Sequence, residues 1–153
     1  MKLTEEEKSF LKERTDKKIA EIESYLDDLI SFKPESLEEY KKNKLNKAAC
    51  ERLCEKIAEG LVDLAIFIVR IKEIPYNEED EKAFGILFKH NLIDKVLCNK
   101  LRALKGMRDH IAHKYGEVDD KIVFYSINNE IESDVNEFIS AVKTALEEIQ
   151  DKK

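Results

Sequence analysis

A stripe of apolar residues at helical spacing is the feature that most limits how this chain can fold. Between residues 45 and 71, apolar side chains recur at steps of three and four, at Leu45, Ala49, Leu53, Ile57, Leu61, Leu64, Ile68 and Ile71. From Leu61 to Val69 the segment is apolar on nearly every face of a helix, which places it in the middle of a bundle or between subunits. Gly60 stands just before this segment and permits close approach of a neighbouring helix. The pattern predicts a long, largely buried central helix.

The composition of the chain agrees with a helical domain. The 153 residues include only four glycines, two prolines and no tryptophan, whereas Lys, Glu, Leu and Ile are abundant. A chain of this length forms one domain with a sizeable core. We therefore expect a single all-α domain over residues 1–153, folded as an up-and-down bundle of four to five helices.

Capping residues set the expected boundaries of the first two helices. Thr4 and Glu7 form a capping box at the start of a first helix, which Pro34 ends. Ser36 begins a second capping box. We expect the second helix to run without interruption from this box to Ile71.

Three further helices are expected in the second half of the chain. Asn77 is the expected cap of a short third helix that ends near Asn91, and Asp94 is the expected cap of a fourth. A fifth helix should fill most of the remainder. Its stripe consists of Phe124, Ile127, Ile131, Val135, Phe138, Val142, Ala145 and Ile149.

The charge pattern bears on location and on partners. The N-terminal segment is charged throughout and the run from Leu61 to Val69 is too short to cross a bilayer, so we expect a soluble, cytoplasmic protein with no membrane partner. The net charge of −6 is not typical of a nucleic-acid binder. However, residues 94–114 contain six basic residues and only two acidic residues. This window is either a local basic patch or an ordinary solvated helix face.

Three cysteines, Cys50, Cys54 and Cys98, are the main candidates for metal or redox chemistry. An odd number without a secretion signal indicates reduced, buried thiols rather than a disulfide framework. Together with the histidines they form no recognised spacing of metal ligands. We expect no metal site and no cofactor.

An arginine interrupts the apolar stripe of the fourth helix. The stripe runs through Leu97, Leu101, Leu104, Arg108, Ile111 and Tyr115 at steps of four and three. A guanidinium on an apolar seam is costly to remove from water unless it has a partner or faces a wet cleft. Asp63, the acid inside the apolar second helix, is the expected partner and hence an accessory site residue.

His113 is the candidate for proton transfer. It lies about 140° around the helix and about 7.5 Å along it from Arg108. Asp109 precedes His113 by four residues, so its carboxylate could hold one imidazole nitrogen and leave the other to react. Gly116 has the character of the residue that follows a helix end. The alternative is that His113 is an ordinary surface histidine. His110 lies off the face that carries Arg108, Asp109 and His113.

These residues carry a family resemblance. Arg108, His113 and Tyr115 reproduce the R-x4-H-x-Y motif of HEPN-domain proteins, and the chain specifically resembles the HepT-like toxins. The segment ACERLCEKIAEGLVDLAIFIV resembles the long central helix of that family. The segment AFGILFKHNLIDKVLCNKLRALKGMRDHIAHKYGEVDD resembles its third and fourth helices. The likeness covers roughly residues 45–145.

The resemblance implies both a function and a partner. HepT-like proteins are helical bundles that dimerise through the motif-bearing helices, and they are metal-independent ribonucleases with toxin activity. Their usual partner is a minimal nucleotidyltransferase antitoxin that can add AMP to the motif tyrosine. By position, Arg108 and His113 would be catalytic and Tyr115 would be the modified residue. Asp109 stands where the family often has asparagine or another polar residue.

The chemistry also accounts for a dimer. Cleaving RNA through its own 2′-hydroxyl needs a base, an acid and positive charge near the transition state. A twofold axis would bring two copies of His113 and two copies of Arg108 into one cleft. We expect one His113 to act as base and the other as acid. Two alternatives stay open: a HEPN module that recruits or regulates a nucleotidyltransferase or binds nucleotide without cutting RNA, and a structural helical dimer.

Overall fold

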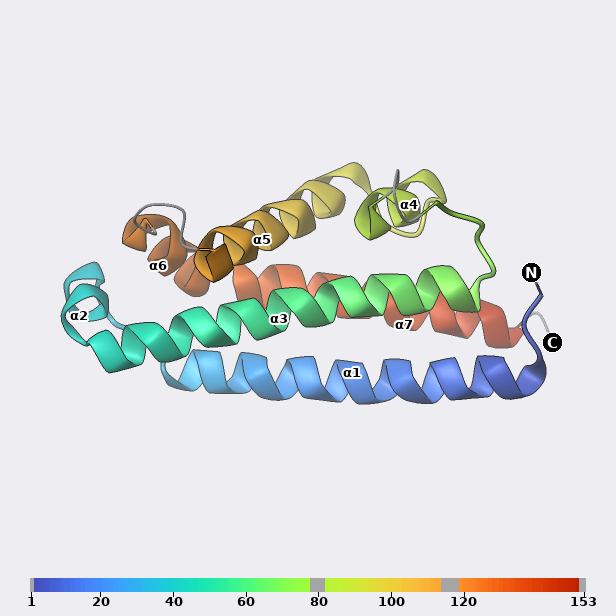
Figure 1. Cartoon of the computed structure of the whole chain (residues 1–153), viewed down its shortest axis with the longest axis horizontal. Coiled ribbons are helices and arrows are strands. Elements are labelled where there is room, and N and C mark those ends of the chain that lie inside the picture. The colour runs from blue at the N-terminus through green and yellow to red at the C-terminus, as the bar shows by residue number, and fades with distance from the viewer. Residues whose placement is uncertain (1, 78–81, 114–118, 152–153) are drawn as a thin grey trace.

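The computed structural model describes residues 2–77, 82–113 and 119–151. Within these ranges the chain forms helices and no strands, in the order α1 Glu5–Ser31, α2 Leu37–Lys42, α3 Lys44–Ile71, α4 Ala83–Lys89, α5 Lys95–His113, α6 Asp120–Asn129 and α7 Ile131–Asp151. Figure 1 shows α1 and α3 as long neighbouring rods, with α4 and α5 on the side of α3 opposite α1. The expected all-α bundle is confirmed.

The core is built around α3. Leu61, Leu64 and Ile68 are each no more than 1% exposed, and α1, α4, α5 and α7 all contact this helix. Burying an aliphatic side chain of this size contributes about 1.5–3 kcal/mol. The predicted stripe is confirmed over this stretch, but it does not begin at Leu45, whose side chain is 84% exposed. No helix in the described ranges is long and apolar enough to cross a membrane.

Gly60 allows α1 and α3 to pack closely. It is buried in α3, and a Cβ atom added there would lie 2.7 Å from Cγ1 of Ile22 in α1. Real Cβ atoms do not come so close to a neighbouring carbon, and Ile22 is itself completely buried. The predicted close approach of a neighbouring helix at Gly60 is therefore confirmed.

The predicted uninterrupted helix from Ser36 to Ile71 is wrong. Ser36 does cap a helix, since its hydroxyl accepts from the amide of Glu39 at 3.1 Å, but that helix is the short α2. Asn43 ends α2, and its side chain caps α3 by accepting from the amide of Asn46 at 3.0 Å. The break turns α2 so that Tyr40 is fully buried, with its ring 6.3 Å from the ring of Phe124 in α6.

Two other boundaries also differ from the prediction. Asn77 does not cap the third helix, because α4 begins at Ala83 and its N-cap residue is Lys82. In Figure 1 the connection leads from the end of α3 to α4, which lies with α5 on the side of α3 opposite α1. The single predicted final helix is divided into α6 and α7 at Glu130, where φ is −126°.

Several capping predictions are confirmed. At α1 the hydroxyl of Thr4 accepts from the amide of Glu7 at 3.1 Å, and the carboxylate of Glu7 accepts from the amide of Thr4 at 3.2 Å. At α5 the carboxylate of Asp94 accepts from the amide of Leu97 at 2.7 Å. The start of α5, which carries the motif, is therefore fixed where the sequence predicts it.

The three cysteines are buried free thiols, as predicted. Cys50, Cys54 and Cys98 are between 0% and 2% exposed. Burial raises the pKa of the Cys50 thiol to about 11, and burial raises that of Cys54 above its ordinary value as well. Thiols in this state are poor nucleophiles and poor metal ligands near neutral pH. They belong to the packing of the bundle.

The close contact at Gly60 gives a test of the core. The change Gly60→Ala should lower the free energy of unfolding by about 1–2 kcal/mol, because the overpacking cost exceeds the gain in helix propensity. Gly106→Ala in α5 is the matched control, since an added Cβ there meets nothing within 4 Å. That control should be neutral or stabilising by up to about 1 kcal/mol. Equal stabilisation by both changes in denaturant titrations would contradict the packing.

Candidate functional site

Arg108 lies between α5 and α3 with two carboxylate partners. Its Nη2 atom donates to Oε1 of Glu59 in α3 at 3.0 Å, and its Nη1 atom donates to Oδ1 of the adjacent Asp109 at 2.9 Å. The side chain of Arg108 is 31% exposed. The guanidinium therefore lies at the rim of the core, where α5 leaves the apolar seam and meets water.

The predicted partner of Arg108, Asp63, is wrong. Asp63 instead lies 3.4 Å from Nζ of Lys18 and so joins α3 to α1. The acid that reaches Arg108 is Glu59, one helical turn earlier in α3, which the sequence interpretation missed. That interpretation sought a deeply buried partner for a deeply buried cation, whereas both members of the real pair are about one-third exposed. A search for acids one turn away from Asp63 would have included Glu59.

The two carboxylates keep the guanidinium charged and hold it in place. The hydrogen bond to Asp109 and that to Glu59 raise the pKa of Arg108 above its ordinary value. Glu59 also has a second cation within reach, because Nζ of Lys56 lies 4.0 Å from its Oε2 atom. An anionic ligand that approaches Nη1 or Nη2 therefore competes with the negative charge of Asp109 and Glu59.

One nitrogen of Arg108 has no acceptor. Its Nε atom is buried and finds no hydrogen-bond partner in the part of the chain that the structure describes. A buried donor left without an acceptor costs about 1–3 kcal/mol. The guanidinium is therefore not in its best possible environment, and a small rearrangement that brings Nε to an acceptor would be favourable.

His113 is the last residue of α5 and is exposed to solvent. It stands on the same side of the helix as Asp109, four residues earlier. His110 is about 60° from His113 around the helix, and it lines a cavity of about 330 Å³ between α5 and α6. His113 lies about 40° around α5 from Asp109 and about 140° from Arg108. Tyr115 and Gly116 lie outside the described residues.

No metal centre is found near these side chains. Among the described residues, no group of three or more His, Cys, Asp or Glu side chains is placed to hold a metal ion. The charged groups around Arg108 are instead hydrogen-bonded to one another. In chemical terms, the end of α5 presents a fixed cation and a neighbouring imidazole, which is a combination suited to phosphate binding and proton transfer.

The sequence is similar to those of proteins named as nucleases. A family model described as Ribonuclease HepT-like matches residues 16–142. The mRNA nuclease HepT of Shewanella oneidensis is 27% identical over 89 residues, which cover 58% of this chain and 66% of that protein. The tRNA nuclease HepT of Aphanizomenon flos-aquae is 26% identical over 107 residues, which cover 70% of this chain and 73% of that protein. The match to the Shewanella nuclease thus spans just under two thirds of that relative.

Comparisons of structure support the fold. The tri-AMPylated Shewanella oneidensis HEPN toxin, solved in complex with an MNT antitoxin, matches with a TM-score of 0.75 and 24% identity over 85% of this chain and 96% of that one. YutE, a cytosolic protein of unknown function from Bacillus subtilis, matches with a TM-score of 0.73 and 14% identity over 89% of this chain and 90% of that one. The predicted HEPN-type bundle is confirmed.

The pairing of Arg108 can be tested by a double-mutant cycle. Glu59→Ala and Arg108→Ala should show a coupling in the free energy of unfolding of about 0.5 kcal/mol, which decreases as salt is added, because both side chains are partly exposed. The matched control cycle combines Asp63→Ala with Arg108→Ala and should show no coupling. A coupling found only with Asp63 would reinstate the original prediction and contradict the geometry.

Proposed function

The chain belongs to the HepT-like ribonuclease family, and from this premise we propose that it is a metal-independent endoribonuclease toxin whose catalytic residues are Arg108 and His113. One observation carries the proposal. The end of α5 holds a charged arginine at the rim of the core and an exposed histidine within two turns of it. The nuclease names of the relatives from Shewanella and Aphanizomenon support the same activity.

The proposed reaction uses the 2′-hydroxyl of the RNA as its nucleophile. A base takes the proton of this hydroxyl, the 2′-oxygen bonds to phosphorus, and the bond from phosphorus to the 5′-oxygen breaks. An acid gives a proton to the leaving 5′-oxygen. The products are a 2′,3′-cyclic phosphate and a 5′-hydroxyl end. A guanidinium beside the phosphate stabilises the charge that develops in the transition state.

A homodimer supplies the two proton-transfer groups. One chain offers one histidine of the motif, and His110 lines the cavity between α5 and α6 instead. Pairing the α5 helices across a twofold axis would bring two copies of His113 and two of Arg108 together. We assign the role of base to one His113 and that of acid to the other. Both Arg108 side chains then contact the cleaved phosphate.

The carboxylates at Arg108 have a defined part in this proposal. Glu59 and Asp109 hold the guanidinium while no substrate is bound. A phosphate competes with these carboxylates for Nη1 and Nη2, because two of its oxygens can accept from the guanidinium as two carboxylate oxygens do. Asp109 then becomes free to turn toward His113, four residues later on the same side of α5. Asp109 is therefore an accessory residue that can orient the imidazole.

The cognate partner is a minimal nucleotidyltransferase antitoxin. The Shewanella toxin with which this chain shares its fold was solved as a tri-AMPylated protein in complex with an MNT antitoxin. By the motif, Tyr115 is the acceptor here: its phenolic oxygen attacks the α-phosphate of ATP, pyrophosphate leaves, and the phenolic proton is released. Each added AMP brings bulk and negative charge near the phosphate site, so RNA is excluded on both counts.

The second candidate is a HEPN module that binds a nucleotidyltransferase or a nucleotide without cutting RNA. It is favoured by the two carboxylates that already occupy Arg108. In that function Arg108 would stabilise the junction of α3 and α5, and His113 would have no chemical role. Only the ribonuclease requires His113 to move a proton.

Cleavage of RNA in EDTA tests the proposal. Purified, unmodified wild-type protein should give 2′,3′-cyclic phosphate ends, and His113→Ala should reduce the rate by about 100-fold or more, because a proton-transfer group is lost. His110→Ala, three residues earlier in α5 at the cavity between α5 and α6, is the matched control and should retain activity. A requirement for magnesium, or equal rates for wild type and His113→Ala, would favour the binding module.

The modification is tested with the cognate nucleotidyltransferase and ATP. Intact-mass measurements should show the addition of AMP to wild-type protein, with a parallel loss of RNA cleavage. Tyr115→Phe should accept no AMP there, since it lacks the phenolic oxygen. Tyr125→Phe removes the hydroxyl of a tyrosine that is 59% exposed in α6, and this variant should be modified like wild type. AMP on Tyr115→Phe at the wild-type level would move the acceptor to another residue.

A further inference from the structure

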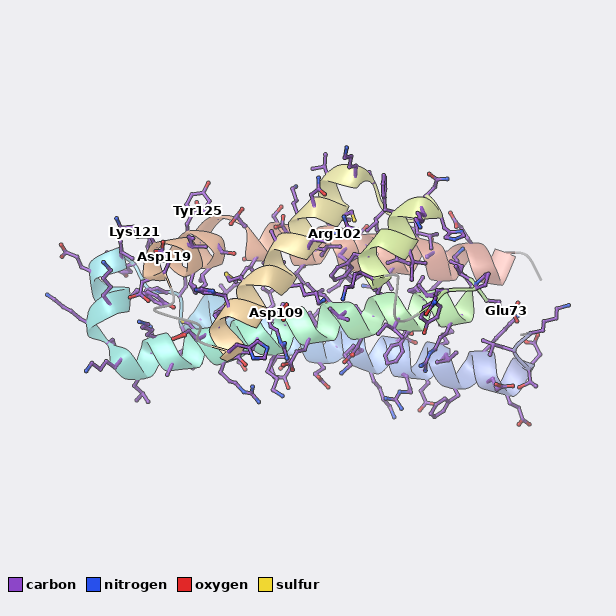
Figure 2. All side chains as sticks on the ribbon, turned by 45° about the horizontal axis from the view of Figure 1, so that its top comes forward. Glu73, Arg102, Asp109, Asp119, Lys121 and Tyr125 are labelled. Carbon is purple, nitrogen blue, oxygen red and sulfur yellow. The ribbon has the colours of Figure 1, made fainter. Side chains whose placement is uncertain are left out.

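Two cations precede Asp109 and His113 on the same side of α5. Arg102, Lys105, Asp109 and His113 follow one another at steps of three, four and four, so they fall within about 80° around the helix. Arg102 and His113 are about 16.5 Å apart along its axis. In Figure 2, Arg102 is marked where α5 lies beside α4, and Asp109 where α5 crosses α3. We call Arg102 and Lys105 the cationic edge of α5.

The cationic edge carries charge that no acid neutralises. Within the described part of the chain, neither Arg102 nor Lys105 forms an ion pair. Lys100, on the side of α5 that faces α7, behaves differently: its Nζ atom lies 3.8 Å from Asp134 and 3.6 Å from Glu137. In a chain of net charge −6, two unpaired neighbouring cations form a local site that attracts anions.

A groove adjoins the cationic edge. It is a cavity of about 280 Å³ between α3, α4 and α5, and its walls include Val62, Ile66, Phe84, Tyr76, Lys82 and Lys105. The floor is aliphatic and aromatic, while two lysines supply positive charge at its border. This combination suits a nucleotide, because a base needs an apolar or aromatic surface and its phosphate needs a cation.

The guanidinium of Arg102 lies beside Gly85 of α4. A Cβ atom added to Gly85 in α4 would be 2.7 Å from Nη2 of Arg102. The absence of a side chain at Gly85 thus lets the guanidinium lie against α4. Arg102 and Lys105 are therefore presented side by side, from the α4 end of α5 toward Arg108.

We propose that the cationic edge binds the RNA phosphates next to the cleaved phosphate, and that the groove holds the adjacent base. This inference rests on the proposed ribonuclease function. Lys105 precedes Arg108 by three residues, about 4.5 Å along the helix, and Arg102 precedes Lys105 by the same step. The three cations thus form a row that winds about 120° around α5, and a single RNA strand can follow it with the cleaved phosphate at Arg108.

A second copy of the chain is a less favourable occupant of this edge. A twofold interface pairs the same surface on both molecules, so cations near the axis would face their own copies. Arg108 can approach its own copy because Glu59 and Asp109 offset its charge. Arg102 and Lys105 form no ion pair with the described residues, so bringing two copies of them together would oppose association. A polyanion, in contrast, gains from every unpaired cation in the row.

The test measures the cleavage of a long and a short RNA substrate in EDTA by purified wild-type protein and by a purified variant. The double variant Arg102→Ala/Lys105→Ala should raise KM for a single-stranded oligoribonucleotide about fivefold, with kcat unchanged. The slope of log KM against log salt should become less steep by about 0.7 for each lost contact. A dinucleoside monophosphate has only the cleaved phosphate, so its cleavage should be the same for wild type and variant.

The matched control is Lys12→Ala/Lys143→Ala, which removes two exposed lysines of α1 and α7 and the same amount of charge. If the two double variants have equal KM values for the oligonucleotide, the inference is wrong while the ribonuclease function stands. If Arg102→Ala/Lys105→Ala changes the molar mass in solution, the edge is a contact between copies, and the inference is again wrong. Absence of cleavage by wild type on both substrates would instead overturn the proposed function.

Discussion

The need to cover α3 on all sides is the constraint on which the rest of the structure depends. Near its middle, α3 is apolar around nearly its whole circumference, so no single partner helix can bury it. Close packing at Gly60 brings α1 against one face, while α4, α5 and α7 contact α3 elsewhere. This arrangement carries α5 across α3 and thereby brings the side chain of Arg108 to that of Glu59.

Arg108 shows how a cation can be placed on a helix that is otherwise part of the core. A fully buried guanidinium would be very costly to desolvate, but the position at the rim leaves it about one-third exposed. Two carboxylates hold it, and one nitrogen finds no acceptor among the described residues. The local charge around Arg108 is consequently not strongly positive.

The success of the sequence predictions depended on the range of the interaction involved. The capping residues Thr4 and Asp94 act on amides within three residues, and both were placed correctly. The breaks at Asn43 and Glu130 were missed, because helical spacing of apolar residues continues across them. At the first break, Asn43 ends α2 and caps α3, while the burial of Tyr40 against α6 depends on a residue far along the chain.

The sequence by itself determined the helical class, the buried central segment, the position of Arg108 and His113 on one helix and the family, because these follow from local spacing and residue type. Only the tertiary structure decided which acid meets Arg108, that His110 lines a cavity against α6, and that Arg102 and Lys105 form no ion pair with the described residues and lie beside a groove. The physical reason is that an ion pair between helices depends on their relative rotation and shift. A shift of α5 by one helical turn along α3 would place Asp63 rather than Glu59 beside Arg108. Neither helix's sequence specifies that shift.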